Sequence, residues 1–297
     1  MKINSFEILE PLPDSKNLHA IVMLRPWLDA GSVGTKTLNL REKRWGATEV
    51  GKLAKPGTFF DFTRYRPTTR NIDNRRVLKI PNTSISFAVG QESPEDFLFV
   101  HLLEPHAYAE EYIESVVEVL KTLGVKRYCR IGAMYNAVPH TRPLWVTGSL
   151  NGNPLEGIPG VSAMRRSTYQ GPTSILNLIT EETEKSGIET MSLMMHLPQY
   201  IELEEDYNGI SRMLEVLCNL YGLPNDLPDK ERGRRQYDEI SSEVERNPAL
   251  QSLVKRLEIY YDSRDTESAE ISPQDTQLSP EVEQFLENLG KDIQDKP

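Results

Sequence analysis

Four strongly apolar segments, each followed directly by a polar turn, constrain the fold of this 297-residue chain more than any other feature. Continuous apolar runs of this length are typical of strands buried on both faces of a sheet. Stretches with the spacing of amphipathic helices lie between them. This alternation predicts a three-layer α/β sandwich in which helices cover a largely parallel, twisted sheet. The four predicted strands span residues 19–24, 97–103, 128–134 and 190–197.

Further elements complete the predicted body of the fold. Helices are expected over residues 32–45, 107–123, 172–186 and 204–221. Shorter β-type segments are expected over residues 48–53, 58–62, 76–80, 84–89 and 144–147. A loop rich in Gly, Asn and Pro is expected over residues 148–160 because these residues favour turns.

The composition changes after Gly222 and suggests three parts. Residues 1–225 are predicted to form the α/β core domain. Residues 226–262 are charge-rich and predict a helical extension, in which Asn247-Pro248 has the pattern of an N-cap followed by proline at the first helical position. Residues 263–297 are acidic and poor in bulky side chains, so we expect a disordered tail with one short helix at 280–289.

Charge and hydropathy exclude two classes of partner. The net charge is −10, but residues 264–297 carry nine acidic and three basic side chains, so the rest of the chain is close to neutral. A near-neutral body argues against nucleic-acid binding. No apolar run approaches the roughly 18 residues of a membrane helix, and the N-terminal segment lacks the pattern of a signal peptide. We therefore expect a cytoplasmic protein without a membrane partner.

The sequence carries no recognisable catalytic or cofactor motif. Cys129 and Cys218 fall in apolar segments, which predicts buried thiols rather than a disulfide or a metal pair. The five histidines lack zinc-ligand spacing, no serine stands in a nucleophile elbow, and the glycines near Gly31 lack the Walker lysine. We expect no metal and no cofactor, and the chain is predicted to be a non-enzyme, with the question of catalysis left open.

Six short motifs, taken in order along the chain, carry a family resemblance. They are Pro26–Gly31, Asp61–Pro67, Glu104-Pro105, Pro139–Pro143, Tyr169–Pro172 and Leu197–Ile201. Together they resemble the proteasome assembly chaperone 2 family over residues 18–223. The resemblance implies a fold related in outline to nucleoside phosphorylases and hydrolases. It also implies a homo-oligomeric ring, with a trimer expected, and proteasome-like subunits as partners.

This sequence differs from archaeal relatives of the family in one binding motif. Archaeal relatives bind the proteasome α-ring through a C-terminal tripeptide of a hydrophobic residue, tyrosine and any residue. This sequence ends in Asp295-Lys296-Pro297, and the matching side chains Ile259-Tyr260-Tyr261 occupy an internal position.

Polar side chains at the predicted strand ends form the candidate site. Polar groups at the carboxyl edge of a parallel sheet line a crevice in many α/β proteins. One interpretation is that Arg142 pairs with Asp29 or Glu104, a buried ion pair that fixes the loops. The other is that the crevice binds a small molecule. The candidate residues are Asp29, Arg66, Glu104, His140, Arg142 and Tyr200.

Two functions from different classes follow from these patterns. The leading prediction is a non-enzymatic, self-associating protein of the assembly-chaperone type that acts through protein–protein contacts. The alternative is a small-molecule-binding protein or enzyme that uses the strand-end crevice formed by Asp29, Glu104, His140 and Arg142.

Overall fold

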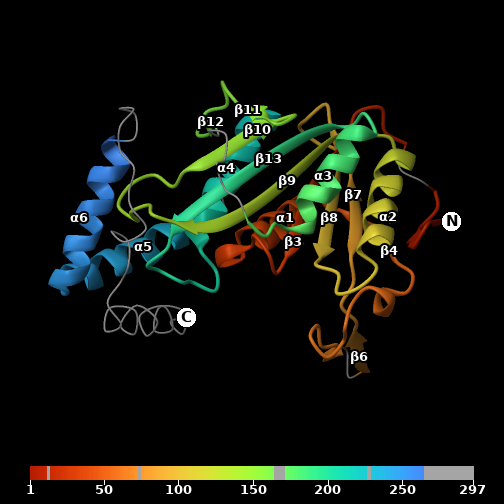
Figure 1. Ribbon diagram of the computed structural model, residues 1–297, viewed down its shortest axis with the longest axis horizontal. Helices are drawn as coiled ribbons and strands as arrows, with labels where there is room; N and C mark the ends of the chain where they lie inside the picture. Colours follow the sequence, from red (N-terminus) through yellow and green to blue (C-terminus); the bar gives the residue numbers. More distant parts are fainter. Residues whose placement is uncertain (12–13, 73–74, 164–170, 226–228, 264–297) are drawn as a thin grey trace.

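The computed structural model describes residues 1–11, 14–72, 75–163, 171–225 and 229–263 (Figure 1). Its main sheet is mixed and has eleven strands, ten of them on one continuous path with β12 beside β10. Along that path the order is β1-β2-β4-β7-β8-β3-β9-β13-β10-β11. The neighbours β8, β3, β9 and β13 run parallel, and the other pairs along this path run antiparallel, whereas β12 lies parallel to β10. The predicted largely parallel sheet is thus correct for the centre and wrong for both flanks.

The four apolar runs form the four central strands, as predicted. Each strand extends beyond its predicted apolar run at one or both ends. The strands of the main sheet are β1 Lys2–Ile3, β2 Phe6–Ile8, β3 Leu18–Arg25, β4 Thr48–Leu53, β7 Ser84–Ala88, β8 Asp96–Leu103, β9 Val125–Asn136, β10 Val146–Leu150, β11 Asn153–Pro154, β12 Ser162–Ala163 and β13 Glu189–Pro198.

Two local predictions are wrong. Residues 58–62 do not form a strand, since the short helix η2 (Pro56–Thr58) and a turn occupy this region. Pro56 lies at the first position of η2, where its fixed φ and missing N–H favour a helical turn over a strand. The strand expected at 144–147 begins at Val146 and runs to Leu150, so it takes up the start of the predicted loop.

Helices cover both faces of the sheet (Figure 1). Because side chains alternate along a strand, β3 contributes Ile21 and Met23 to one core cluster and Ala20 and Val22 to the other. Helices α1, α4, α5 and α6 bury side chains in the first cluster, and α2 and α3 bury theirs in the second. The bounds are η1 Ala30–Ser32, α1 Val33–Trp45, α2 Ala109–Thr122, α3 Ile175–Lys185, α4 Tyr207–Tyr221, α5 Lys230–Glu245 and α6 Pro248–Ser263.

The two C-terminal helices lie beyond the ends of β9 and β13 (Figure 1). The predicted cap of α6 is confirmed, because Oδ1 of Asn247 accepts hydrogen bonds from the backbone of Ala249 and Leu250 at 3.0 and 3.3 Å. Leu250 and Leu253 are buried in the same core cluster as the main sheet. The helix predicted at 280–289, with the rest of the acidic tail, lies outside the described residues.

A separate β-hairpin projects from the body of the protein. Strands β5 (Thr68–Ile72) and β6 (Arg75–Lys79) pair only with each other, antiparallel, and project from the edge of the molecule at the bottom of Figure 1. Every residue of β6 is exposed. None of the helices in the described ranges is both long and apolar enough to cross a membrane.

Candidate functional site

The carboxyl ends of the central strands meet at one edge of the sheet. The pairs β3–β8, β3–β9 and β9–β13 are parallel, so the turns that follow these strands emerge at the same edge. Five of the six predicted side chains occupy these turns: Asp29 after β3, Glu104 after β8, His140 and Arg142 after β9, and Tyr200 after β13. Arg66 is exposed on the loop before β5 and makes no polar contact with another described residue.

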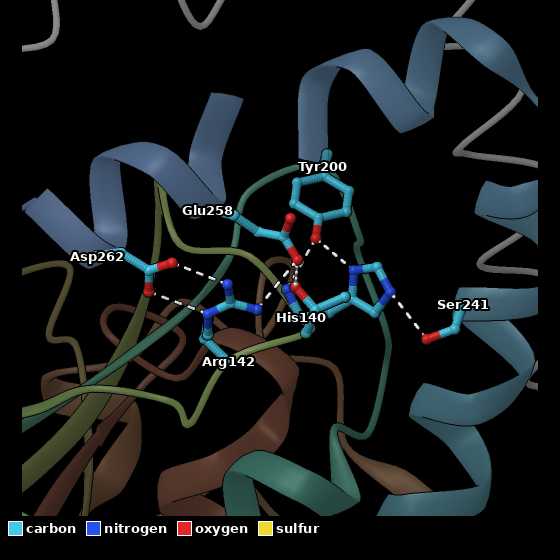
Figure 2. A network of polar contacts seen from close by, with 7 residues as sticks. His140, Arg142, Tyr200, Ser241, Glu258 and Asp262 are labelled. Atoms are coloured by element: carbon cyan, nitrogen blue, oxygen red, sulfur yellow. Dashed lines mark hydrogen bonds and ion pairs between the residues drawn. The ribbon is translucent and has the colours of Figure 1, made fainter. Parts of the chain in front are cut away.

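His140 and Tyr200 join the turns of two neighbouring strands (Figure 2). The Tyr200 hydroxyl accepts a hydrogen bond from the backbone N–H of His140 at 2.8 Å and contacts Nδ1 of the same residue at 2.5 Å. On the other side of the ring, Nε2 lies 3.1 Å from Oγ of Ser241 in α5. Both ring nitrogens of His140 are therefore occupied by neutral hydroxyl groups.

The environment of His140 selects its protonation state. Burial lowers the pKa of the imidazole to about 4, so the ring is neutral near pH 7. Burial also raises the pKa of the Tyr200 phenol, which keeps its proton and can donate it to Nδ1. Nε2–H then donates to Ser241, whose hydroxyl donates to the Tyr237 carbonyl at 3.0 Å. This continuous chain of hydrogen bonds ties the turn after β9 to α5.

Arg142 binds α6 rather than the strand-end carboxylates. Its Nε and Nη2 lie 3.0 and 2.8 Å from the two carboxylate oxygens of Asp262, a bidentate pair. Its Nη1 lies 3.1 Å from Oε1 of Glu258. The predicted pairing of Arg142 with Asp29 or Glu104 is wrong, because the loop after β9 extends beyond the sheet edge and meets a helix some 120 residues later in the chain.

Two further contacts hold the same loop against α6. The Thr141 hydroxyl donates to Oε1 of Glu258 at 2.6 Å, and the Tyr261 hydroxyl donates to the Pro143 carbonyl at 2.8 Å. The ring of Tyr261 also stacks on Trp145, with ring centroids 4.6 Å apart. We call the contact of Thr141, Arg142 and Pro143 with Glu258, Tyr261 and Asp262 the α6 clasp.

Asp29 caps the start of α1. Its Oδ1 accepts a hydrogen bond from the backbone N–H of Thr35 at 3.0 Å, and its Oδ2 accepts one from the Thr35 hydroxyl at 2.5 Å. Burial raises the pKa of Asp29, and the hydrogen bonds from Thr35 oppose that rise. A carboxylate at this position is also stabilised by the positive end of the helix dipole. Asp29 therefore orders the turn after β3.

Glu104 lies beside the start of α3. Its Oε1 is 3.4 Å from the backbone nitrogen of Ile175, and its carbonyl accepts a hydrogen bond from the Tyr65 hydroxyl at 3.2 Å. Its Oε2 is buried and has no hydrogen-bond partner among the described residues. Burial raises the pKa of this carboxyl. An unpaired buried carboxylate oxygen is costly, which makes this corner of the edge distinct from the other two.

The predicted residues thus share an edge but divide into three contact groups. Asp29 is hydrogen-bonded to α1, and Glu104 contacts the start of α3. The third group, His140 with Arg142 and Tyr200, is bonded to α5 and α6. Within the parts of the chain that the structure describes, no hydrogen bond or ion pair links one group to another.

Sequence patterns did not reveal Asp206, a fully buried carboxyl in the same region. It caps α4 by accepting a hydrogen bond from the Gly209 N–H at 2.7 Å, and it accepts another from the Tyr237 hydroxyl at 2.9 Å. Burial raises the pKa of Asp206 to about 6. An Asp three residues before a helical Gly is the N-cap pattern, which could have identified the cap. The partner Tyr237, 31 residues later, could not have been identified from spacing.

The described residues offer no activated nucleophile or metal cluster. No group of three His, Cys, Asp or Glu side chains converges in these ranges. Cys129 and Cys218 are free, buried thiols, as predicted. Burial raises the pKa of Cys129 to about 12, so this thiol stays protonated and is a poor nucleophile.

Comparisons with known proteins agree with this architecture. A protein of unknown function from Corynebacterium glutamicum matches with a TM-score of 0.78 and 18% identity, over 90% of this chain and 100% of that one. A proteasome-assembly chaperone homologue from Mycobacterium tuberculosis matches with a TM-score of 0.68 and 19% identity, over 80% and 99%.

The archaeal proteasome activator PbaB from Pyrococcus furiosus matches with a TM-score of 0.59 and 15% identity, over 82% of this chain and 100% of that one. A comparison with curated protein sequences finds no match. These structural similarities show a shared fold. The sequence profile of the PAC2 family matches residues 23–246, which include all four central strands except the start of β3, and the chain therefore belongs to the PAC2 family.

Proposed function

We propose that this protein is a non-enzymatic, self-associating member of the PAC2 family that acts in the cytoplasm through contacts with proteasome-like subunits. The observation that carries this proposal is the α6 clasp with the adjoining His140 hydrogen bonds. The loop after β9, which carries His140 and Arg142, is engaged by helices of the same chain. Loop-fixing contacts of this kind favour a rigid binding scaffold over a catalytic crevice.

The state of His140 and Arg142 supports this proposal. His140 holds hydroxyl partners on both ring nitrogens, and its lowered pKa makes it a weak base. Arg142 directs its donors to Glu258 and Asp262, so an anionic substrate would have to displace two carboxylates. Both side chains therefore have structural roles within the chain.

The choice of partner rests on the relatives. Solved structures with this fold include a proteasome-assembly chaperone homologue and a proteasome activator. Their identities to this chain are 19% and 15%, so the partner class comes from their names and from membership in the family. A ring of identical subunits, with three expected, would present several copies of one binding surface to a proteasome-like ring.

A reconstitution with purified components tests the proposal. The full chain is mixed with α-type proteasome subunits of the organism that encodes it, and complexes are followed by native mass spectrometry. We expect a complex that speeds α-ring assembly and that persists in the matched variant Arg142→Gln, because the clasp is not the partner surface. A genome without α-type subunits, or no complex at tens of micromolar, contradicts the proposal.

Glu104 favours a second candidate, a small-molecule site at its corner of the edge. Its buried Oε2 lacks a partner within the described ranges, and a cationic or hydroxylated ligand would supply one. A thermal-shift screen of amines and polyols against the wild type and Glu104→Gln tests this. A ligand that stabilises the wild type but not the variant favours the small-molecule site. If no compound stabilises the wild type, the small-molecule site is contradicted and only the assembly function is proposed.

A further inference from the structure

The β5–β6 hairpin is too small to be stable in water on its own. It is a two-stranded sheet whose second strand is exposed at every position. An isolated two-stranded hairpin is marginally stable in water, and both of its edges offer unpaired backbone groups. Three large apolar side chains are also exposed on or beside β6: Val77 at 43% on one face, and Leu78 at 59% and Ile80 at 46% on the opposite face. These features indicate a surface that is covered by another molecule.

The hairpin is also strongly basic. Between Thr68 and Ile80 the sequence holds four basic residues and one acidic residue, although the whole chain has a net charge of −10. The register places Arg75, Val77 and Lys79 on one face, together with Arg70, which pairs across from Val77. This face therefore has an apolar centre flanked by cations. None of these cations has an ion pair to another described residue.

A groove with the opposite character lies between α2 and α3. It has a volume of about 720 Å³ and is lined by Ile113, Val117 and Leu178 together with five glutamates. Leu178 is 47% exposed. The five glutamates are Glu110, Glu114, Glu118, Glu181 and Glu182.

Within the described residues, the charges of the groove are either unpaired or held in exposed pairs, since Glu181 and Glu182 both pair with Lys185 on the surface of α3. Glu110 and Glu114 form no ion pair with a described residue. Glu118 pairs with Lys121, and the side chains of this pair are 43% and 48% exposed. Exposed pairs of this type contribute little, so an incoming cation can replace the lysine at small cost.

The spacings of the two surfaces match. Arg75 and Lys79 are four residues apart on a strand, which corresponds to about 13 Å. Glu110 and Glu118 are eight residues apart on a helix, which corresponds to about 12 Å. Val77, midway between the two cations, would then lie over the apolar floor of the groove between the two glutamates.

From this match of charge, apolar character and spacing we infer that the β5–β6 hairpin of one subunit binds the α2–α3 groove of a second copy of this chain. The inference rests on the proposed function, because it names the surfaces through which the chain self-associates. The two surfaces are different, so the interface is heterologous, and repetition of the same contact closes a ring when the rotation allows it. Each subunit in such a ring gives one hairpin and receives another.

Paired charge reversals measured by light scattering after size exclusion test this contact. The hairpin variant Arg75→Glu/Lys79→Glu and the groove variant Glu110→Lys/Glu118→Lys should each be monomeric, whereas the wild type is an oligomer. All changed side chains are at least partly exposed, so the variants should fold, and circular dichroism verifies it. A chain that carries all four changes should regain the oligomer, because the charges are complementary again.

Mixing the two variants gives the most specific result. The basic hairpin of the groove variant matches the acidic groove of the hairpin variant, and the acidic hairpin of the hairpin variant matches the basic groove of the groove variant, so both contacts form but only between unlike variants. We expect an oligomer of alternating variants in equal numbers that grows beyond a dimer, which an interface between identical surfaces would not give. As a control, Arg234→Glu/Arg235→Glu reverses two exposed charges on α5 and should leave the oligomer intact.

An engineered disulfide tests directly whether the two surfaces lie against each other. Val77→Cys and Leu178→Cys, mixed under mild oxidation, should form a covalent dimer that neither variant forms alone. An oligomer unchanged by the charge reversals overturns the proposed contact while self-association stands. A monomeric wild type overturns self-association itself, and the contact with it.

Discussion

The hydroxyl of Tyr200 lies 2.5 Å from Nδ1 of His140 and 2.8 Å from the backbone nitrogen of the same residue. One phenol thus holds the turn after β9 to the turn after β13 at two points. Since the same histidine also contacts Ser241 in α5, the C-terminal helices depend on this phenol for the position of the loop that they bind.

Removal of this hydroxyl should be costly. Tyr200→Phe leaves the buried backbone N–H of His140 without an acceptor, and we expect a loss of about 1–3 kcal/mol in the free energy of unfolding. Urea denaturation measures it. Tyr108→Phe is the matched control, because the Tyr108 side chain is 62% exposed and its change should be close to zero. Equal effects in the two variants would contradict the role of Tyr200.

His140 should make stability depend on pH. Its pKa falls from 6.5 in the unfolded chain to about 4 in the folded protein, so the unfolded state binds more protons between these values. Stability due to His140 is therefore complete above about pH 6.5 and is lost as the pH falls toward 4. Between pH 7 and pH 5 the loss should be about 2 kcal/mol. The difference in unfolding free energy between wild type and His140→Gln should shrink accordingly, and a constant difference would refute the assignment.

Asp206 should act with the opposite sign. Its pKa rises from 3.8 to about 6 in the folded protein, so the folded state binds more protons in this range and loses stability as the pH rises. Asp206→Asn keeps a side-chain cap for Gly209 and cannot ionise. Relative to wild type, this variant should gain about 2 kcal/mol of stability between pH 4.5 and pH 7.5. Thermal melts across this range, with Asp238→Asn on the exposed face of α5 as control, measure the trend.

Gly31 should tolerate no side chain. Its φ is +55°, and a Cβ there would lie 2.7 Å from Cβ of Asp206. The left-handed conformation and the overlap together should cost Gly31→Ala about 2–5 kcal/mol. Gly46 has a similar φ of +62° with nothing within 4 Å of a Cβ, so Gly46→Ala should lose only about 1 kcal/mol. Comparable losses in both variants would show that the contact with Asp206 is unimportant.

Loss of the ion pairs in the α6 clasp should loosen α6 locally. Arg142→Gln removes the bidentate pair with Asp262 and the contact with Glu258. Because these groups are partly exposed, we expect a small effect: amides in the last turns of α6 should exchange about two- to fivefold faster. Hydrogen exchange with mass spectrometry measures it, and Arg256→Gln, an exposed change on the same helix, should leave the rates unchanged.

Local patterns predicted much of the architecture. Buried strands such as 19–24 and 190–197 are recognisable because residues covered on both faces must be apolar throughout. The cap at Asn247 was equally clear, since its side chain bonds the backbone two and three residues later. The flanking strands could not be oriented in this way, because parallel and antiparallel neighbours of short strands share one residue pattern.

Residue patterns alone established that polar turns follow the central strands and that these turns share one edge, because parallel strands end together. Which side chains meet there was settled by the packing of the folded chain. Arg142 binds Asp262 and not Asp29, and Asp206 meets Tyr237, because ion pairs and buried hydrogen bonds depend on distances of a few ångströms between segments far apart in the chain. Residue type and spacing do not specify such distances, because they are set only by the packing of the helices.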